Sequence, residues 1–133
     1  MAAKLNLHVL EDLYAVCQLE ATASIPAWAL GEGFLSISRS EEELTVVCLQ
    51  NRVPPEVKAE RNWRCLGLAG PFDFALTGIL ASVLNPLAKA GVGIFAVSTY
   101  NTDYVLLKHH QLEQAVAALE QAGHVVHAVA LKP

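Results

Sequence analysis

Two polar segments, residues 70–76 and residues 98–103, could together form a small-molecule site. The first starts with a Gly-Pro turn and leads into a predicted helix, whose unpaired backbone N–H groups would bind a carboxylate. The second offers hydroxyl and amide groups, and a carboxylate in either segment, Asp73 or Asp103, would bind an ammonium group. We therefore expect ligand-binding residues at these positions: Phe72, Asp73, Phe74, Ala75, Leu76, Thr99, Tyr100, Asn101 and Asp103.

Each of these residues also has a purely structural explanation. Asp73 can cap the predicted helix, and Asn101 and Asp103 can belong to an ordinary turn. Phe72 and Phe74 can simply pack in the core. The site hypothesis therefore depends on the two segments meeting, and the sequence leaves open whether they meet within one module or across a pair of modules.

No catalytic or metal centre is expected. The five histidines lack the spacing of metal ligands, and the Gly-x-Gly pairs precede predicted strands instead of the helices that phosphate loops require. No nucleophile–base motif is present. Cys17, Cys48 and Cys65 lie in apolar, strand-like segments, which indicates buried and reduced thiols. We expect no catalytic residue, no cofactor and no bound metal.

The composition indicates one compact domain or two very small ones. The chain has 133 residues, of which 53% are hydrophobic and 17% charged. Its net charge of −4 gives no basic surface for nucleic acid or for an anionic membrane. The mostly apolar segment 78–97 could pass for a membrane span, but Asn85, Pro86 and Lys89 interrupt it. With no signal-peptide pattern at the N-terminus, we expect a cytoplasmic protein.

Hydrophobic periodicity predicts two groups of elements separated by a polar linker at residues 51–62. The first group has strands at 5–10, 13–19, 34–38 and 44–49 and a short helical turn at 25–30. The second has strands at 63–70, 92–98, 103–108 and 124–131 and helices at 74–90 and 109–123. Gly91 and Gly123 are the expected helix stops, and Pro86 should bend the first helix. The apolar strand at 92–98 is expected to be central.

The second group has the order β-α-β-β-α-β. That order predicts an α+β, ferredoxin-like fold: a four-stranded antiparallel sheet with both helices on one face. The hairpin at 34–49 matches the hairpin at 94–109 at an offset of 60 residues, which places Ser38 on Ser98. We therefore expect a degenerate first unit with shortened helices plus linker at 1–61, and a complete unit at 62–133.

The complete unit resembles the ACT domain family. The resemblance is carried by the turn at 70–79, the Leu-Ala-x-Ala-Gly pattern at 87–91 and the Ser-Thr pair at 98–99. It is greatest to the ACT modules of aspartate kinases and to small stand-alone proteins with two ACT-like units, which are related to the cytosolic arginine sensors of animals. The resemblance implies an allosteric, non-catalytic regulator that binds a free amino acid where the first strand–helix loop faces a strand of a paired module.

Two other functions remain open on the sequence. The chain could be a protein–protein interaction module without a small ligand, in which case the polar turn residues would be dispensable. It could also be an enzyme, although no cluster of acids and bases can be nominated. Regulation by an amino acid would involve either a homo-oligomer or a regulated protein partner.

Overall fold

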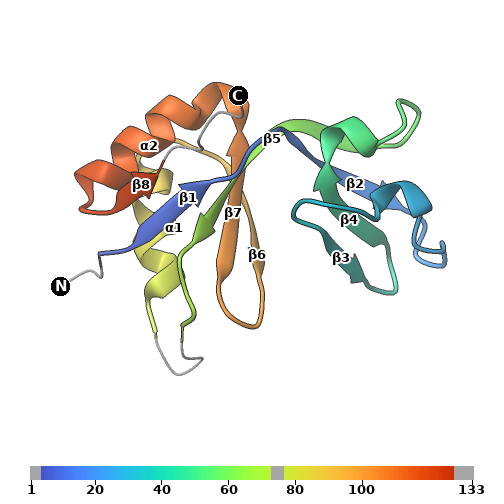
Figure 1. Cartoon of the computed structure of the whole chain (residues 1–133), viewed down its shortest axis with the longest axis horizontal. Coiled ribbons are helices and arrows are strands. Elements are labelled where there is room, and N and C mark those ends of the chain that lie inside the picture. The colour runs from blue at the N-terminus through green and yellow to red at the C-terminus, as the bar shows by residue number, and fades with distance from the viewer. Residues whose placement is uncertain (1–3, 73–76, 128–133) are drawn as a thin grey trace. The chain divides into compact units, whose positions relative to one another are not determined.

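A computed structural model of the chain describes residues 4–72 and 77–127. It contains two compact units (Figure 1). Unit 1 consists of Met1–Glu11 together with Arg64–Pro133, and unit 2 consists of Asp12–Trp63. Along the sequence, unit 2 therefore interrupts unit 1. This grouping differs from the expected division between residues 61 and 62, because the first strand of the chain belongs to the C-terminal unit.

Unit 1 contains the predicted β-α-β-β-α-β series and one additional strand. Its strands are β1 (Asn6–Val9), the second half of β5 (Ala59–Leu68), β6 (Ile94–Ser98), β7 (Asp103–Lys108) and β8 (Val125–His127). Its helices are α1 (Ile79–Lys89) and α2 (Leu112–Gln121), and the 3-10 turn η3 (His109–Gln111) leads into α2. The order of elements confirms the ferredoxin-like prediction.

The additional strand, β1, changes the expected sheet. It pairs antiparallel with β5, where Leu7 lies opposite Leu68, and parallel with β8, where Leu7 lies opposite Val126. The strand order in unit 1 is therefore β8-β1-β5-β7-β6, with five strands instead of four and with one parallel pair. Among the described residues β6 pairs only with β7, so β6 is an edge strand and the prediction of a central strand is wrong.

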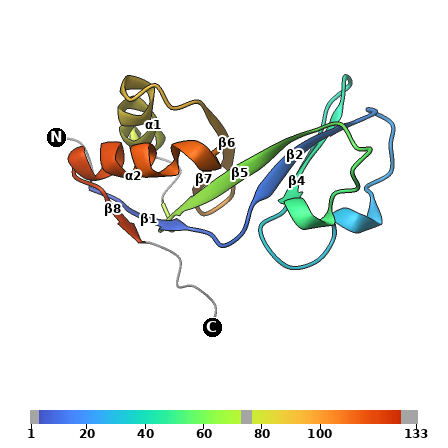
Figure 2. The same cartoon turned by 90° about the horizontal axis from the view of Figure 1, so that it is seen from above.

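Both helices of unit 1 cover the same face of its sheet (Figure 2). Alternate residues of each strand point toward this face, and residues at helical spacing on α1 and α2 meet them. The most deeply buried members of this core are Leu7, Leu66, Val83, Leu87, Val105, Leu107, Ala115 and Leu119. No helix among the described residues is long and apolar enough to cross a membrane.

Glycines end both helices, as predicted. Gly91 has a φ of 77°, and the N–H of the next residue, Val92, donates to the carbonyl of Leu87 at 3.0 Å. Gly123 has a φ of 99° and is followed by the equivalent bond from His124 to Leu119. Both are six-to-one bonds of the Schellman motif.

The start of α1 differs from the prediction. The helix begins at Ile79, with Gly78 at the N-cap in the left-handed conformation (φ 76°). The predicted start at residue 74 and the predicted cap, Asp73, lie outside the described residues, and the N-cap position itself belongs to Gly78. Periodicity identifies the apolar face of a helix better than its first residue, because the ends depend on local capping.

A buried histidine compensates for the proline inside α1. Pro86 has no N–H to donate to the carbonyl of Ser82, four residues earlier. The Nε2 atom of His124 lies 2.8 Å from that carbonyl oxygen, and the N–H of Leu5 donates to Nδ1 of the same ring at 3.1 Å. Since Leu5 can only donate, Nδ1 must accept and Nε2 must carry the proton. His124 is only 3% exposed and connects α1, the end of α2 and the start of β1.

Unit 2 has the same strand order with reduced helices. Its sheet runs β3-β4-β2-β5 and consists of β2 (Tyr14–Leu19), β3 (Ser36–Arg39), β4 (Leu44–Leu49) and the first half of β5. The 3-10 turns η1 (Ala27–Ala29) and η2 (Gln50–Arg52) stand where unit 1 has helices. The predicted linker at 51–62 is thus partly wrong, because its last residues already form β5.

The hairpins of the two units correspond, but at a different offset from the predicted one. In unit 2, Arg39 pairs with Leu44 at the end of the hairpin, and in unit 1, Ser98 pairs with Asp103. These pairs coincide at an offset of 59 residues instead of 60. Side chains in a strand alternate between two faces, so an error of one residue assigns every residue to the wrong face.

Candidate functional site

The two predicted site segments meet in unit 1. The N–H of Phe72 donates to the backbone carbonyl of Asn101 at 2.8 Å, and the hydroxyl of Thr102 donates to the carbonyl of Leu68 at 2.7 Å. These bonds join the segment after β5 to the turn between β6 and β7. A Cβ atom on Gly70 would lie 2.9 Å from the carbonyl oxygen of Asn101, so only glycine permits this close approach.

The turn itself is held by its first and last residues. The hydroxyl of Thr99 donates to the carbonyl of Thr102 at 3.1 Å and accepts from the N–H of Thr102 at 3.3 Å. The N–H of Thr99 also donates to the carbonyl of Thr102, at 2.8 Å. At the base of the turn, the hydroxyl of Ser98 donates to the carboxylate of Asp103. These bonds fix the turn in one conformation and leave its two middle residues, Tyr100 and Asn101, exposed.

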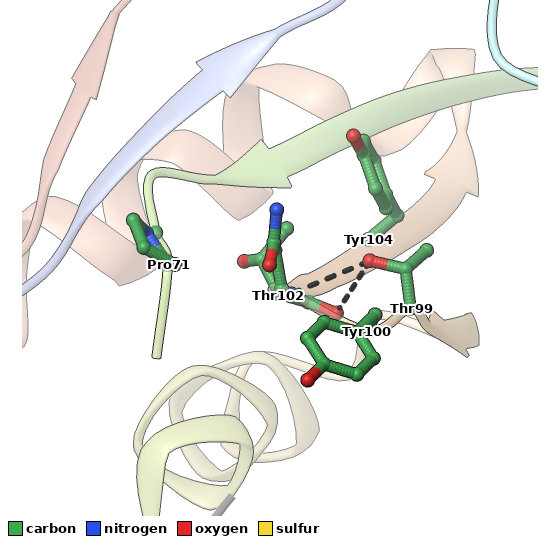
Figure 3. Close-up of a pocket in the computed structure, with 7 residues that line it drawn as sticks. Pro71, Thr99, Tyr100, Thr102 and Tyr104 are labelled. Carbon is green, nitrogen blue, oxygen red and sulfur yellow. Dashed lines mark hydrogen bonds between the residues drawn. The ribbon is translucent and has the colours of Figure 1, made fainter. Parts of the chain in front are cut away.

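A hollow of about 420 Å³ lies between the joined segments, and we call it the turn pocket. Its volume is within the range of small-molecule sites. Figure 3 shows Pro71 on one side and the side chains of the β6–β7 turn on the other. The pocket is lined by Gly70, Pro71, Thr99, Tyr100, Asn101, Thr102 and Tyr104.

The structure brings together some of the predicted residues. Thr99, Tyr100 and Asn101 line the turn pocket. Asp103 does not line it, and Phe72 packs against the core of unit 1 through its side chain, in agreement with its structural explanation. The remaining predicted residues, Asp73, Phe74, Ala75 and Leu76, lie outside the described residues.

Sequence reasoning missed Thr102 and Tyr104 as lining residues. Tyr104 lies one residue after Asp103 and therefore points to the opposite face of β7. Its ring lies over Gly67 of β5, where a Cβ atom would be 3.1 Å from Cε2 of the tyrosine. A glycine in the middle of a strand is the sequence signal for such a close approach, and Gly67 was available as that signal.

The ionisable groups with shifted pKa values are thiols remote from the turn pocket in sequence. Burial raises the pKa of the Cys65 thiol to about 12. In unit 2, a hydrogen bond between the thiols of Cys17 and Cys48 raises the pKa of Cys17, and burial raises it further. All three cysteines are free and buried, which confirms the prediction of reduced core thiols. No group of three or more metal-binding side chains occurs within residues 4–72 and 77–127.

Comparison with known proteins agrees with the fold. A family model described as an ACT domain matches residues 58–121, and a second model, which describes an N-terminal domain, matches residues 12–56. The chain belongs to the ACT domain family. A crystal structure of an Agrobacterium tumefaciens protein is 40% identical to this ACT protein, with a TM-score of 0.94, and the match covers 99% of this chain and 98% of the other.

More distant relatives are regulatory proteins. The cytosolic arginine sensor for mTORC1 subunit 1 of Bos taurus is 27% identical over 111 residues, which cover 75% of this ACT protein and 34% of the sensor. The chain thus spans about a third of the length of the curated relatives it matches. The regulatory subunit of aspartate kinase from Thermus flavus has the same fold, with a TM-score of 0.60 at 12% identity over 91% of this chain and 97% of that one. The predicted resemblance is confirmed.

Proposed function

We propose that this ACT domain protein is a non-catalytic regulator that binds a free amino acid in the turn pocket. The observation that carries the proposal is the meeting of residues 70–72 and 99–102, which hydrogen-bond to each other and line one hollow. The sequence predicted a site at the same two segments for independent reasons. The relatives support the proposal, since they include proteins described as arginine sensors and as regulatory subunits of aspartate kinase.

For the charged ends of the ligand, we retain the assignment made from the sequence. Backbone N–H groups of residues 73–76 would bind the α-carboxylate, and the carboxylate of Asp73 or Asp103 would bind the α-ammonium group. Thr99, Tyr100 and Asn101 would supply neutral contacts.

Binding would act through the joined segments. A ligand in the turn pocket would stabilise the arrangement in which the segment after β5 contacts the β6–β7 turn, and so favour one pairing with a second copy or with a regulated protein. Such a coupling makes the protein an allosteric sensor, and the coupling is reciprocal: the partner would also tighten binding of the amino acid. We propose that this sensing takes place in the cytoplasm, without nucleic acid or membrane partners.

A thermal-unfolding screen of the twenty amino acids tests the proposal. A ligand present at 100 times its dissociation constant should increase the free energy of unfolding by about 2.7 kcal/mol. Asn101→Ala should reduce this increase, whereas Asn85→Ala, at an exposed position on α1, should leave it unchanged. If no amino acid at millimolar concentration shifts the transition, the proposal is wrong.

One observation favours a protein-interaction module as the second candidate. Tyr100 is 81% exposed at the tip of the turn, and an exposed tyrosine is a frequent anchor in protein interfaces. In that case Thr99→Ala and Asp103→Ala would leave partner binding intact, whereas Tyr100→Ala would weaken it. An absence of any amino acid effect in the screen, combined with this pattern, would establish the alternative.

A further inference from the structure

We propose that the turn pocket selects amino acids with uncharged side chains. This inference rests on the proposed function and concerns only the side chain of the ligand, because the α-carboxylate and α-ammonium groups are common to all free amino acids. The observation behind it is the lining: each described residue that lines the pocket is a threonine, a tyrosine, an asparagine, a glycine or a proline.

The acid that follows the turn does not supply the missing charge. Asp103 is outside the lining, and its carboxylate accepts a hydrogen bond from the hydroxyl of Ser98. A cationic side chain in the pocket would therefore leave water without a carboxylate to meet it, and an anionic side chain would find no cation among the described lining residues. Taking an unpaired charge out of water is unfavourable.

The hydrogen-bonding groups of the lining are mostly committed to the turn. The Thr99 hydroxyl bonds to the backbone of Thr102, and the Thr102 hydroxyl donates to Leu68. The backbone carbonyl of Asn101 accepts from Phe72. Within the described part of the chain, the side-chain amide of Asn101 makes no hydrogen bond. It provides both a donor and an acceptor, which suits a neutral polar group or the ligand backbone.

The remaining surface of the pocket is aromatic. The Tyr104 ring lies over Gly67, which keeps the ring close to the sheet, and Figure 3 shows the Tyr100 ring on the other side of the turn. Aromatic rings stabilise an apolar or amide-bearing side chain by burying its surface. A cation on an open ring gains less, because solvent weakens the cation–π interaction at exposed sites.

Isosteric ligand pairs separate charge from shape. We would titrate the full chain by calorimetry with glutamine against glutamate, citrulline against arginine, and norleucine against lysine. In each pair that binds, we expect the neutral member to bind at least about ten-fold more tightly, a difference of about 1.4 kcal/mol. Equal or tighter binding of arginine, lysine or glutamate would overturn the inference and leave the proposed function standing. Absence of binding by any member would contradict both.

A charge placed in the pocket should reverse the selection. Asn101→Asp keeps the shape of the side chain and adds a carboxylate, so the ratio of citrulline to arginine affinity should fall by at least about ten-fold. Asn85→Asp makes the same chemical change at an exposed position of α1 and should leave that ratio unchanged. An equal effect of the two substitutions, or no effect of Asn101→Asp on a folded protein, would overturn the inference.

Discussion

At the scale of single residues, His124 links three elements with one uncharged ring. It accepts from Leu5 and donates to the Ser82 carbonyl that Pro86 leaves without a partner. His124→Ala would leave two buried polar groups unsatisfied, so we expect a loss of about 2–4 kcal/mol in the free energy of unfolding, measured in urea. His127→Ala, at an exposed position on β8, should cost less than about 1 kcal/mol. Similar losses for both variants would contradict this role of His124.

The proline and the histidine should be energetically coupled. Pro86→Ala restores an N–H that can donate to the carbonyl of Ser82. His124→Ala should then be less costly in the Pro86→Ala background than in the wild-type chain, by about 1 kcal/mol. A double-mutant cycle of urea unfolding measures this difference. Additive effects of the two substitutions would show that His124 does not compensate for the proline.

The buried thiol of Cys65 should make stability depend on alkaline pH. Burial raises its pKa from 9.0 to about 12, so between these values the unfolded chain loses a proton that the folded chain keeps. The stabilisation is complete below pH 9 and is lost as the pH rises toward 12, by at most about 1.4 kcal/mol per pH unit. Cys65→Ala should remove this part of the slope. An unchanged slope in that variant, measured by urea unfolding at each pH, would contradict the assignment.

At the scale of elements, the turn pocket depends on how closely the segment after β5 approaches the β6–β7 turn. A methyl group on Gly70 would meet the backbone of Asn101 at 2.9 Å, and the backbone cannot rotate away as a side chain can. We expect Gly70→Ala to lower the free energy of unfolding by about 1–3 kcal/mol and to weaken amino acid binding at least about ten-fold.

Gly93→Ala is the matched control for this substitution. A Cβ atom on Gly93 would have no atom within 4 Å, so the change should leave both stability and ligand affinity close to those of the wild type. If Gly70→Ala binds the ligand as well as Gly93→Ala does, the contact between the two segments does not form the site.

The sequence predicted elements well where a local signal decides them. Gly91 and Gly123 end their helices because glycine readily adopts the left-handed conformation there. The meeting of residues 70–72 with 99–102 could also be expected, because both follow from the order of strands. The edge position of β6 could not be predicted, since its apolar composition is equally compatible with a central strand. The Tyr104 contact with Gly67 joins residues distant in sequence, which no local pattern encodes.

At the scale of the whole molecule, β1 makes unit 1 discontinuous in sequence. The N–H of Leu10 donates to the carbonyl of Cys65 at 2.8 Å, so the chain leaves unit 1 and returns to it at neighbouring positions. We expect a protein in which residues 12–63 are replaced by an Asn-Gly turn to fold as a single module, since two residues suffice to join antiparallel strands. Cooperative urea unfolding followed by circular dichroism provides the measurement.

The fragment 62–133, which the sequence indicated as a complete domain, is the comparison for that protein. It lacks β1 and therefore loses the strand that pairs with both β5 and β8. We expect it to unfold without a cooperative transition. A fragment 62–133 as stable as the fused protein would show that β1 is dispensable and that the expected domain boundary is correct.

The position of β1 between β5 and β8 also has a consequence for biosynthesis. The ribosome makes β1 before every other strand and β8 after all of them, yet the two strands are hydrogen-bonded neighbours. Unit 2 is contiguous, so it can fold while the rest of the chain is still being translated. The sheet of unit 1 can close only after translation has passed β8, and until then the free edge of β1 is open to pairing with other chains. Nascent chains stalled before β8 should therefore bind chaperones that released chains do not.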